Sequence, residues 1–558
     1  MDILKFKDAN CKNCYKCIRE CPVKAIEFKS GSGQAQIIRD DCLLCGRCVL
    51  VCPQNAKESR SDLAEVKALV DSGRRVIVSM APSFIAEFPA HSIADMRHAL
   101  QQLGVCDVEE TAIGASVVKK EYERILKEEA PKVLISSCCH SIVKLIQDYH
   151  ADALPYLAKV LSPMQAHGRL IKEKDPEAAV VFIGPCISKK QEVEESDCVD
   201  FALTFEELHH WLEESRVEIP QEEEQDEKFR ARYFPITGGI VDSMDHQDSY
   251  RYVSVDGIEE CREVLEQVAE GNLNGYFIEM SACSGSCIHG PAMRRHAGGK
   301  LAARAKVQSY GTDKQDYAIA QPTQLSREIK AEIQNVSMPG EKEIQRILQK
   351  MGKTSPEKEL NCGACGYPTC RDKAVAVYFG KADIEMCLPY MRERAESLSD
   401  QIINATPNAI MAMDSHLIVQ QVNQAACELF EVEDQSSLKG RYVGEILPDT
   451  DFIKVLDDKQ DMLNVKMYFS KYDKYVQKSI IYDEGNGMLV VVMQDITKQQ
   501  AEADRLGAIK YETVKVADKV IEKQMRIVQE IASLLGETTA ETKIALTKLK
   551  SAILEETK

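Results

Sequence analysis

The segment Ala179-Val180-Val181-Phe182-Ile183-Gly184-Pro185-Cys186 is an unbroken apolar run that ends in a cysteine. Its length and lack of alternation are typical of a strand buried on both faces of a parallel sheet. Two similar runs occupy residues 75–82 and 132–136, and amphipathic segments at 117–128 and 141–150 lie between the runs. This alternation of buried strands with helices predicts an α/β fold.

Three loops that follow apolar strands carry cysteines. They are Ser136-Ser137-Cys138-Cys139-His140, Gly184-Pro185-Cys186-Ile187-Ser188-Lys189-Lys190 and Glu279-Met280-Ser281-Ala282-Cys283-Ser284-Gly285-Ser286-Cys287. Sites in α/β proteins usually assemble from loops at the carboxyl ends of strands. A single cysteine is more often a small buried apolar residue, but three such loops favour one shared site.

Near the amino terminus, one cysteine spacing occurs twice. Both copies read C-x2-C-x2-C-x3-C-P, and their cysteines are Cys11, Cys14, Cys17, Cys21, Cys42, Cys45, Cys48 and Cys52. The repeat resembles the bacterial ferredoxins, in which the fourth thiolate of each run binds the other run's cluster. Two [4Fe–4S] clusters are therefore expected, one on Cys11, Cys14, Cys17 and Cys52, the other on Cys42, Cys45, Cys48 and Cys21. A zinc knuckle or a disulfide framework is the alternative, but neither requires a second copy.

A further four-cysteine motif lies at residues 362–387. Cys362, Cys365, Cys370 and Cys387 follow a C-x2-C-x4-C-x16-C spacing. The motif resembles the small [4Fe–4S] domain of corrinoid iron–sulfur proteins, and glycine-rich residues 361–366 would let backbone N–H groups approach cluster sulfurs. Zinc also accepts four thiolates and is the alternative. The other cysteines are predicted to be ordinary buried thiols; they are Cys106, Cys198, Cys261 and Cys427.

Length, charge and hydropathy narrow the class of protein. At roughly 150 residues per domain, 558 residues suggest three to four domains. The first residues lack the apolar core of a signal peptide, and no stretch reaches the ~18 apolar residues of a membrane span. Clustered free thiols favour the reducing cytoplasm. A net charge of −18 argues against direct nucleic-acid binding.

Residues 400–497 have a different character. After a helix expected at 387–405, strand-like runs occupy 409–414, 417–423, 462–470, 474–483 and 487–494. This order, with Asn423 and Phe430 in an N-x-A-x4-F pattern and a terminal Asp495-Ile496-Thr497, resembles a PAS sensory domain. An unrelated five-stranded α+β domain is the alternative, because no single PAS residue is diagnostic.

The tail, residues 498–558, is predicted to be helical. Its apolar stripe recurs every seven residues and comprises Leu506, Thr513, Val520, Ile527 and Leu534. Such a stripe suits a coiled-coil seam and hence a homodimer, although packing on the chain's own PAS domain is the alternative. After Gly536, a second helix is expected, with the capping box Thr538-x-x-Glu541 and the apolar residues Leu546, Leu549 and Ile553.

The three cysteine loops resemble the signatures of the [FeFe]-hydrogenase catalytic domain, T-S-C-C-P, P-C-x-x-K-K and E-x-M-A-C-x-x-G-C. Thr237-Gly238-Gly239 likewise resembles that family's V-T-G-G turn. The resemblance implies that the cubane of the H-cluster is held by Cys139, Cys186, Cys283 and Cys287. Cys287 would bridge to a diiron subsite with CO and CN⁻ ligands, Cys138 would relay protons, and Lys189 would donate a hydrogen bond to a cyanide. Heterolytic H2 cleavage needs such a metal site beside a base.

The chain also departs from the fast enzymes of that family. His140 stands in place of the proline after the double cysteine, Ser281 in place of a methionine, and Ser286 in place of a glycine. In the fast enzymes the proton path runs through a pair of glutamates, of which Glu121 would match one among different neighbours. Because residues around a metal site tune its reactivity, these changes predict slow turnover.

Together these segments predict a multidomain α/β protein. The expected domains are a ferredoxin-type domain at 1–60, a hydrogenase-like α/β domain at 61–320, a small iron–sulfur domain at 340–395, an α+β PAS domain at 400–497 and signalling helices at 498–558. The order resembles the sensory [FeFe]-hydrogenases and implies a hydrogen or redox sensor with four [4Fe–4S] clusters and a diiron subsite. Its implied partners are H2 and protons, a ferredoxin or another redox protein, hydrogenase maturation proteins, and a separate kinase or phosphatase. An ordinary bidirectional hydrogenase, or an electron-transfer or scaffold protein without the diiron site, is the alternative.

Overall fold

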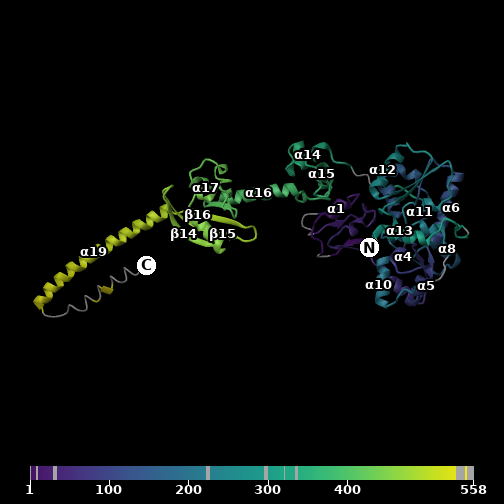
Figure 1. Cartoon of the computed structure of the whole chain (residues 1–558), viewed down its shortest axis with the longest axis horizontal. Coiled ribbons are helices and arrows are strands. Elements are labelled where there is room, and N and C mark those ends of the chain that lie inside the picture. Colours follow the sequence, from purple (N-terminus) through teal and green to yellow (C-terminus); the bar gives the residue numbers. More distant parts are fainter. Residues whose placement is uncertain are drawn as a thin grey trace. The chain divides into compact units, whose positions relative to one another are not determined.

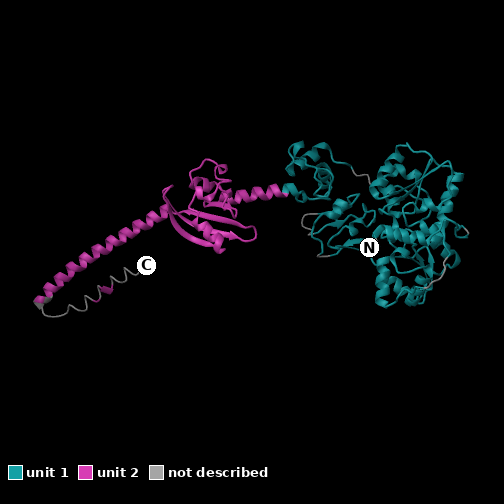
Figure 2. Cartoon of the chain, viewed as in Figure 1, with its two compact units in different colours: residues 1–390 teal, residues 391–558 magenta. Residues whose placement is uncertain are grey.

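The computed structural model describes residues 2–7, 10–28, 34–221, 227–294, 299–319, 321–332, 337–535, 544 and 547–548. The chain divides into two compact units, residues 1–390 and 391–558 (Figure 2). The boundary falls inside α16 (Leu388–Ala405), the helix that was expected at 387–405.

The two cysteine runs near the amino terminus fold in the same way. β1 (Leu4–Phe6) pairs with β4 (Lys57–Ser59), and β2 (Ile26–Glu27) pairs with β3 (Gln36–Ile37), both antiparallel. Each run contains one short helix, α1 (Lys16–Glu20) or α2 (Arg47–Leu50). A left-handed residue precedes each helix, Tyr15 at φ 55° and Gly46 at φ 69°. The chain therefore turns sharply between the second and third cysteines of each run.

The described part of residues 61–320 contains two parallel sheets (Figure 1). The first has the order β6-β5-β8-β9, with β5 (Val76–Met80), β6 (Asp107–Glu110), β8 (Ala179–Gly184) and β9 (Phe201–Thr204). The second has the order β10-β11-β7, with β7 (Val133–Ile135), β10 (Arg251–Asp256) and β11 (Tyr276–Ser281). The α/β prediction is confirmed, but the three apolar runs divide between two sheets.

Helices flank these strands. They are α3 (Leu63–Asp71), α4 (Phe84–Glu87), α5 (Ile93–Gln102), α6 (Ala112–Glu128), α7 (His140–Tyr149), α8 (Pro163–Lys174), α9 (Lys189–Glu194), α10 (Phe205–Ser215), α11 (Gly239–Ser243), α12 (Ile258–Ala269) and α13 (Gly299–Tyr310). Shorter 3-10 helices lie at Ala151–Tyr156 (η1), Arg230–Tyr233 (η2) and Cys287–His289 (η3). Reciprocal capping boxes fix the starts of α5, α8 and α10, at Ser92, Ser162 and Thr204.

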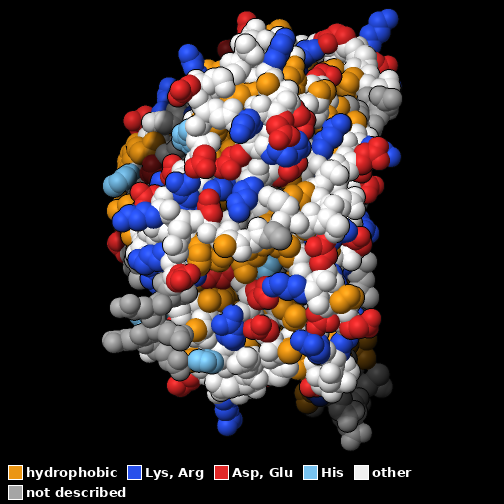
Figure 3. All heavy atoms as spheres, turned by 90° about the vertical axis from the view of Figure 1, so that its right-hand side faces the viewer, with side chains coloured by type: hydrophobic (Ala, Val, Ile, Leu, Met, Phe, Trp, Pro, Cys, Tyr) orange, Lys and Arg blue, Asp and Glu red, His pale blue; other side chains and the backbone are white. Residues whose placement is uncertain are grey.

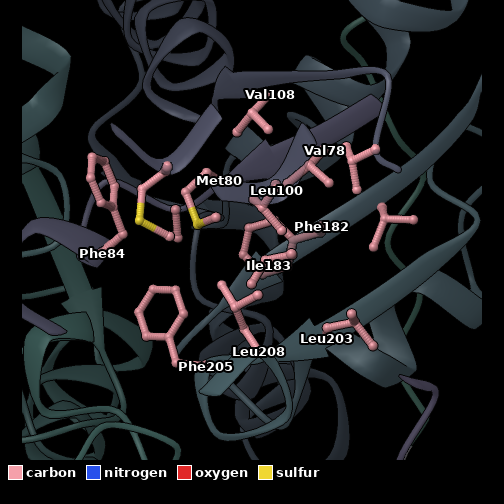
Figure 4. Close-up of a cluster of buried hydrophobic side chains, with 14 of the residues drawn as sticks. Val78, Met80, Phe84, Leu100, Val108, Phe182, Ile183, Leu203, Phe205 and Leu208 are labelled. Atoms are coloured by element: carbon pink, nitrogen blue, oxygen red, sulfur yellow. The ribbon is translucent and has the colours of Figure 1, made fainter. Parts of the chain in front are cut away.

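The core around the first sheet joins side chains from both of its faces (Figure 4). Val78 of β5, Phe182 of β8 and Leu208 of α10 are among its buried members. Beside this core, Lys190 of α9 is fully buried, with Nζ 3.1 Å from Asp62 Oδ2 and 2.9 Å from Glu207 Oε2. Since an unpaired buried charge is costly, this ion-pair network fixes the start of α9.

Cys106 differs from its prediction as a buried thiol. It is exposed, whereas Cys198, Cys261 and Cys427 are buried. Cys106 lies just before β6, and its predecessor Val105 is the buried residue. Since side chains alternate in extended chain, the thiol is placed outside the core.

The surface of this unit carries both signs of charge. On the face shown in Figure 3, acidic and basic side chains are interspersed, with small groups of hydrophobic side chains between them. Such a mixture creates no strong field of one sign on that face. Among the described helices, none combines the length and apolar character needed to cross a bilayer.

Residues 341–387 form a small helical region. It contains α14 (Glu341–Lys350) and α15 (Cys370–Tyr378), with 3-10 helices at Pro356–Lys358 (η4) and Ile384–Met386 (η5). A capping box of Thr369 and Asp372 starts α15. α15 therefore begins at one of the cysteines of the 362–387 motif.

The second unit contains one five-stranded antiparallel sheet in the order β13-β12-β16-β15-β14. Its elements are β12 (Ala409–Met413), β13 (Val419–Val422), α17 (Gln424–Leu429), η6 (Gln435–Ser437), η7 (Val443–Glu445), α18 (Thr450–Asp458), β14 (Met462–Phe469), β15 (Lys474–Asp483) and β16 (Met488–Asp495). The five predicted strands are confirmed. Asn423 is buried and caps α17 through its side chain.

A single long helix, α19 (Thr497–Leu535), follows the sheet. The first predicted tail helix is thus confirmed. Its apolar side chains include Leu506, Ile509, Val520, Ile527 and Ile531, which are all exposed. The second predicted tail helix depends on Thr538, Glu541, Leu546, Leu549 and Ile553, which lie outside the described residues.

Candidate functional site

Four thiols follow the carboxyl ends of β7, β8 and β11 and are near enough that the charge of one raises the pKa of another. They are Cys139, Cys186, Cys283 and Cys287, here called the loop cage. Desolvation raises the pKa of Cys283, and the neighbouring Cys186, Cys139 and Cys287 thiolates raise it further. Desolvation and Cys139 likewise raise the pKa of Cys186 to about 11. Thiols that repel one another when ionised favour a bound metal, which offsets their charge.

Lys189 borders the loop cage at the first residue of α9. Its Nζ donates a hydrogen bond of 3.3 Å to the Cys138 backbone carbonyl and forms an ion pair with Glu192. Burial would lower the pKa of Lys189, but Glu192 raises it. Burial would also raise the pKa of Glu192, yet Lys189 holds it at about 2. Lys189 therefore stays charged and can donate a hydrogen bond to an anionic ligand.

Tyr122 of α6 contacts the Cys138 thiol. Its Oη lies 3.3 Å from Cys138 Sγ and 3.1 Å from Ser137 Oγ, and it accepts a 2.9 Å hydrogen bond from Ser137 N–H. Tyr122 is fully buried, which raises its pKa well above the usual 10. Desolvation also raises the pKa of Cys138 to about 12. Both groups are thus protonated near neutral pH.

The structure does not bring Glu121 to this thiol. Glu121 forms an ion pair with Arg124, 2.7 Å away, on the outer side of α6. Successive residues of a helix are rotated by about 100°. Tyr122, which follows Glu121, therefore points into the protein while Glu121 points away from the loop cage.

The amino-terminal cysteine runs provide two further thiol sets. One pocket is lined by all four thiols of the second site, defined as Cys21, Cys42, Cys45 and Cys48. The first site is defined as Cys11, Cys14, Cys17 and Cys52. Desolvation raises the pKa of Cys17, Lys57 opposes that rise, and the Cys11 and Cys14 thiolates add to it. Desolvation would raise the pKa of Cys52, but hydrogen bonds from the backbone N–H groups of Ala56 and Gln54, together with the charge of Lys57, lower it. The same buried lysine thus lies near thiols of both runs.

The motif at 362–387 surrounds another pocket. Its lining includes the third site, defined as Cys362, Cys365, Cys370 and Cys387. Lys373 of α15 is fully buried beside these thiols, and its Nζ donates a 3.1 Å hydrogen bond to the Ile384 carbonyl. The thiols of Cys365, Cys387 and Cys370 oppose the lowering of the Lys373 pKa that desolvation causes.

These donor sets fit iron–sulfur clusters. Each set has four thiolates, the usual ligands of a [4Fe–4S] cluster. A buried lysine, Lys57, Lys189 or Lys373, lies next to one or more of the sets and offsets the negative charge that a thiolate-bound cluster brings into the protein. The chemistry of the sets therefore suits electron transfer.

Comparison with protein families gives four matches along the chain. Residues 74–291 match the model described as iron only hydrogenase large subunit, C-terminal domain. That region is an iron-only hydrogenase domain. Residues 10–56 match a 4Fe-4S dicluster domain, residues 359–389 match a putative Fe-S cluster domain, and residues 397–466 match a PAS domain.

Several known proteins are similar to parts of the chain. Iron hydrogenase 1 of Clostridium pasteurianum is 24% identical over 39% of this chain and 50% of its own length. The NADP-reducing hydrogenase subunit HndD of Solidesulfovibrio fructosivorans is 25% identical over 53% of this chain and 58% of its own. The cytosolic Fe-S cluster assembly factor NAR1 of Kluyveromyces lactis is 27% identical over 24% of this chain and 32% of its own. The matched part thus spans about half, or less, of each relative.

Solved structures give weaker likenesses. A structure of an [FeFe]-hydrogenase, from a study of its inactivation by oxygen, aligns at a TM-score of 0.40 and 15% identity, over 49% of this chain and 99% of that chain. A PAS domain of an HTR-like protein from Haloarcula marismortui aligns at a TM-score of 0.16 and 18% identity, over 19% of this chain and 95% of that chain.

Two residues of the hydrogenase domain that differ from the family signatures, His140 and Ser286, are sequence neighbours of loop-cage cysteines. His140 is buried, and neither ring nitrogen has a hydrogen-bond partner among the described residues. Burial lowers its pKa to about 4, so the ring is neutral near pH 7. Ser286 is buried at φ 59° and ψ −155°, in a region that favours glycine. A serine in the place of a glycine therefore strains the loop between Cys283 and Cys287.

Glu279 is a further residue of the hydrogenase domain that sequence reasoning did not single out. Its buried carboxylate accepts hydrogen bonds from Gly238, Ile240 and Val241 N–H, at 3.0, 3.0 and 3.1 Å. It thereby ties the Thr237-Gly238-Gly239 turn to β11, four residues before Cys283. Desolvation nevertheless raises its pKa to about 7. The signal was present in the sequence, because a glutamate opens the third cysteine loop.

Proposed function

We propose that the chain is a sensory [FeFe]-hydrogenase that oxidises H2 slowly and reversibly and reports the result through its PAS domain and α19. One observation carries this proposal: Cys138 and Lys189 both adjoin the loop cage. Tyr122 and Lys189 contact Cys138 directly, through its thiol and its backbone carbonyl respectively. A scaffold or electron-transfer protein would need four thiols, but it would need neither a relay thiol nor a buried lysine beside them.

The residues around the loop cage have separate tasks in this proposal. A bound cubane with a diiron CO/CN⁻ subsite would supply the metal at which H2 is cleaved. Lys189 orients that group by a charge-assisted hydrogen bond to an anionic ligand. Cys138 passes the proton on by exchanging its own thiol proton for it; Tyr122 is its hydrogen-bonded neighbour, and Ser137 in turn bonds Tyr122.

The low rate in this proposal follows from Tyr122, the side chain next to Cys138. A carboxylate that titrates near neutral pH can take a proton and release it to solvent. Tyr122 has a pKa raised far above that range, so its hydroxyl can pass a proton only by exchanging one for another. A low rate suits a detector, whose task is to sense H2 rather than to consume it.

The proposed partners follow from the thiol sets and from α19. H2 and protons are the substrates, and a ferredoxin or another redox protein exchanges electrons with the dicluster domain in a reducing cytoplasm. Hydrogenase maturation proteins install the diiron group. We further propose that the exposed stripe of α19 forms a homodimer seam and regulates a separate kinase or phosphatase.

Infrared spectroscopy of protein matured with hydrogenase maturases tests the active site. CO and CN⁻ bands are expected, together with slow H2 oxidation. Protein that receives only cubanes serves as the control and is expected to show neither. If maturation leaves no such bands, the electron-transfer or scaffold alternative holds instead.

A second experiment separates a sensor from an ordinary hydrogenase. Activity of the partner kinase or phosphatase is compared under H2 and under argon with the same matured protein. A ligand can shift a signalling equilibrium only by binding its two states differently. Equal partner activity in both gases, with the change in cluster oxidation state verified, would leave a slow hydrogenase with a passive tail.

The dimer seam is tested by placing a charge in it. Ile527→Lys is expected to weaken self-association at least tenfold, because an unpaired charge in an apolar seam is costly. Gln529→Lys adds the same charge at an exposed position off the stripe and is the matched control. Sedimentation of both variants measures their self-association constants. Equal constants would show that the dimer contact lies elsewhere.

A further inference from the structure

The dicluster domain and the helical region at residues 341–387, here called the third-site domain, share one hydrophobic core. It contains Ile18 and Leu44 from the dicluster domain and Tyr367, Ala376 and Met386 from the region more than 300 residues further along the chain. Cys17, Cys48, Cys21 and Cys365 belong to this core or pack against it. Ligand cysteines of two separate motifs thus meet in a single packed layer.

One close approach lies between α1 and the loop that carries Cys365. Gly366, next to Cys365, has φ +94°, and a Cβ there would lie 3.0 Å from both Arg19 N and Ile18 Cγ2. Arg19 donates a 3.1 Å hydrogen bond to the Ala364 carbonyl. At this φ any side chain would be strained and crowded, so glycine lets the Cys365 loop approach α1 closely.

Tyr367 lies at this contact. It is only 3% exposed, and its Oη has no hydrogen-bond partner among the described residues. Burial raises its pKa, and so do the thiolates of Cys365 and Cys21, one from the third site and one from the second. Tyr15 of the first run also approaches this domain, where it meets the carboxylates Asp383 and Glu385; the thiolate that acts on it is Cys11 of its own run, not one of the third site.

The second site also lies close to the loop cage. Cys45 adds to the thiolates that raise the pKa of Cys283, after desolvation and the other cage cysteines. A Cβ at Gly46, which follows Cys45, would lie 2.3 Å from Pro291 Cβ and 3.2 Å from Ile187 Cδ1. The second site therefore has the loop cage on one side and the third site on another.

We propose that the third site is an internal electron acceptor of the hydrogenase domain, supplied through the second site, with Tyr367 as the contact between them. One electron passes from the second site to the third; no bond forms or breaks, and no proton moves. The buried ring provides a continuous medium for this transfer, and its hydroxyl donates a hydrogen bond to a cluster-bound sulfur. The supply of electrons from H2 rests on the function proposed above, whereas the order of the sites does not.

The order of the sites is tested without H2 or maturation. Protein carrying only cubanes is reduced with dithionite, and electron paramagnetic resonance detects magnetic coupling between the third-site cluster and its neighbour. Cys45→Ala, which removes the second-site cluster, is expected to abolish this coupling, and Cys14→Ala, which removes the first-site cluster, is expected to leave it. The reverse pattern would overturn the proposal whatever the hydrogenase domain does.

The role of Tyr367 is tested by freeze-quench spectroscopy of matured protein mixed with H2. Tyr367→Leu is expected to slow reduction of the third site about tenfold or more relative to reduction of the second. Tyr367→Phe keeps the ring and should keep the rate, but it should make the third-site midpoint potential more negative because a hydrogen-bond donor is lost. Tyr378→Leu, at an exposed tyrosine of the same domain, is the matched control.

The outcomes are distinguishable. An unchanged rate in Tyr367→Leu, with iron content equal to the parent, would overturn the role of the ring. If Tyr367→Leu lost the third-site cluster, Tyr367→Phe would still test the hydrogen bond through the midpoint potential, and an unchanged potential would refute it. No reduction by H2 in any protein, with coupling intact in dithionite, would reject the hydrogenase function and leave the order of sites standing.

Discussion

The loop cage differs in construction from the side of α6 that faces Cys138, here called the α6 wall. The loop cage takes its thiols from loops on two parallel sheets, and buried charges fix those loops: Lys190 holds the start of α9, and Glu279 holds the turn beside β11. The α6 wall presents one buried phenol, Tyr122, and turns its neighbouring carboxylate outward. The loop cage therefore offers four thiols, whereas α6 presents a phenol rather than a carboxyl to Cys138. Under the proposed function, a single neighbouring helix would restrict the rate at the site without altering its ligands.

Loss of a cage ligand is the largest expected effect. Cys283→Ala removes the thiol that interacts with all three of the others, so about six irons per chain and all H2 activity should be lost. Iron analysis and H2-dependent dye reduction measure both. Cys261→Ala, at a buried cysteine outside the loop cage, is the control and should keep both. Normal iron and activity in Cys283→Ala would show that the loop cage does not hold the H-cluster.

Removal of the relay thiol comes next. Cys138→Ala should lower turnover about 100-fold, as expected when a positioned proton-transfer group is lost. Iron content and the infrared bands should not change, since Cys138 is not a cage ligand. Cys138→Asp keeps a titratable group and should retain more activity. Turnover equal to that of the parent in Cys138→Ala would disprove the relay.

A substitution in the α6 wall is expected to raise the rate of H2 oxidation rather than lower it. Tyr122→Glu places a carboxyl beside Cys138 and should raise H2 oxidation about tenfold. The rate should increase with pH through the pKa of the new carboxyl, because only its ionised form accepts the proton. Tyr122→Phe, which has no exchangeable proton, should not gain activity. Equal rates in the Glu and Phe variants, at equal iron content, would show that this wall does not limit turnover.

Glu121 should have the smallest effect. Its carboxylate pairs with Arg124 at a partly exposed position, so Glu121→Gln should change turnover less than twofold and stability by less than about 1 kcal/mol. Steady-state rates and thermal unfolding measure this. A tenfold loss of turnover would return Glu121 to the proton path.

The sequence revealed the cage and the strands better than the α6 wall. Ligand spacing and unbroken apolar runs such as 179–184 are local patterns, and they placed the cysteine loops at strand ends correctly. The choice between Glu121 and Tyr122 depends on which face of α6 is buried, and a shift of one residue along a helix changes that face. The division of the apolar runs between two sheets was also hidden, because strand pairing is decided by contacts distant in sequence. Cys106 was misjudged because hydrophobicity alone does not set the direction of a side chain before a strand.

The shared core of the dicluster and third-site domains has a consequence for biosynthesis. Ile18 and Leu44 are covered partly by Tyr367, Ala376 and Met386. At ~5–20 residues per second, a ribosome needs roughly 15 to 65 seconds after residue 60 to reach residue 386. The dicluster domain therefore leaves the ribosome well before the segment that completes its core. Its cysteines stay accessible to cluster donors during that interval, and a fragment that ends before residue 359 would keep an apolar face uncovered.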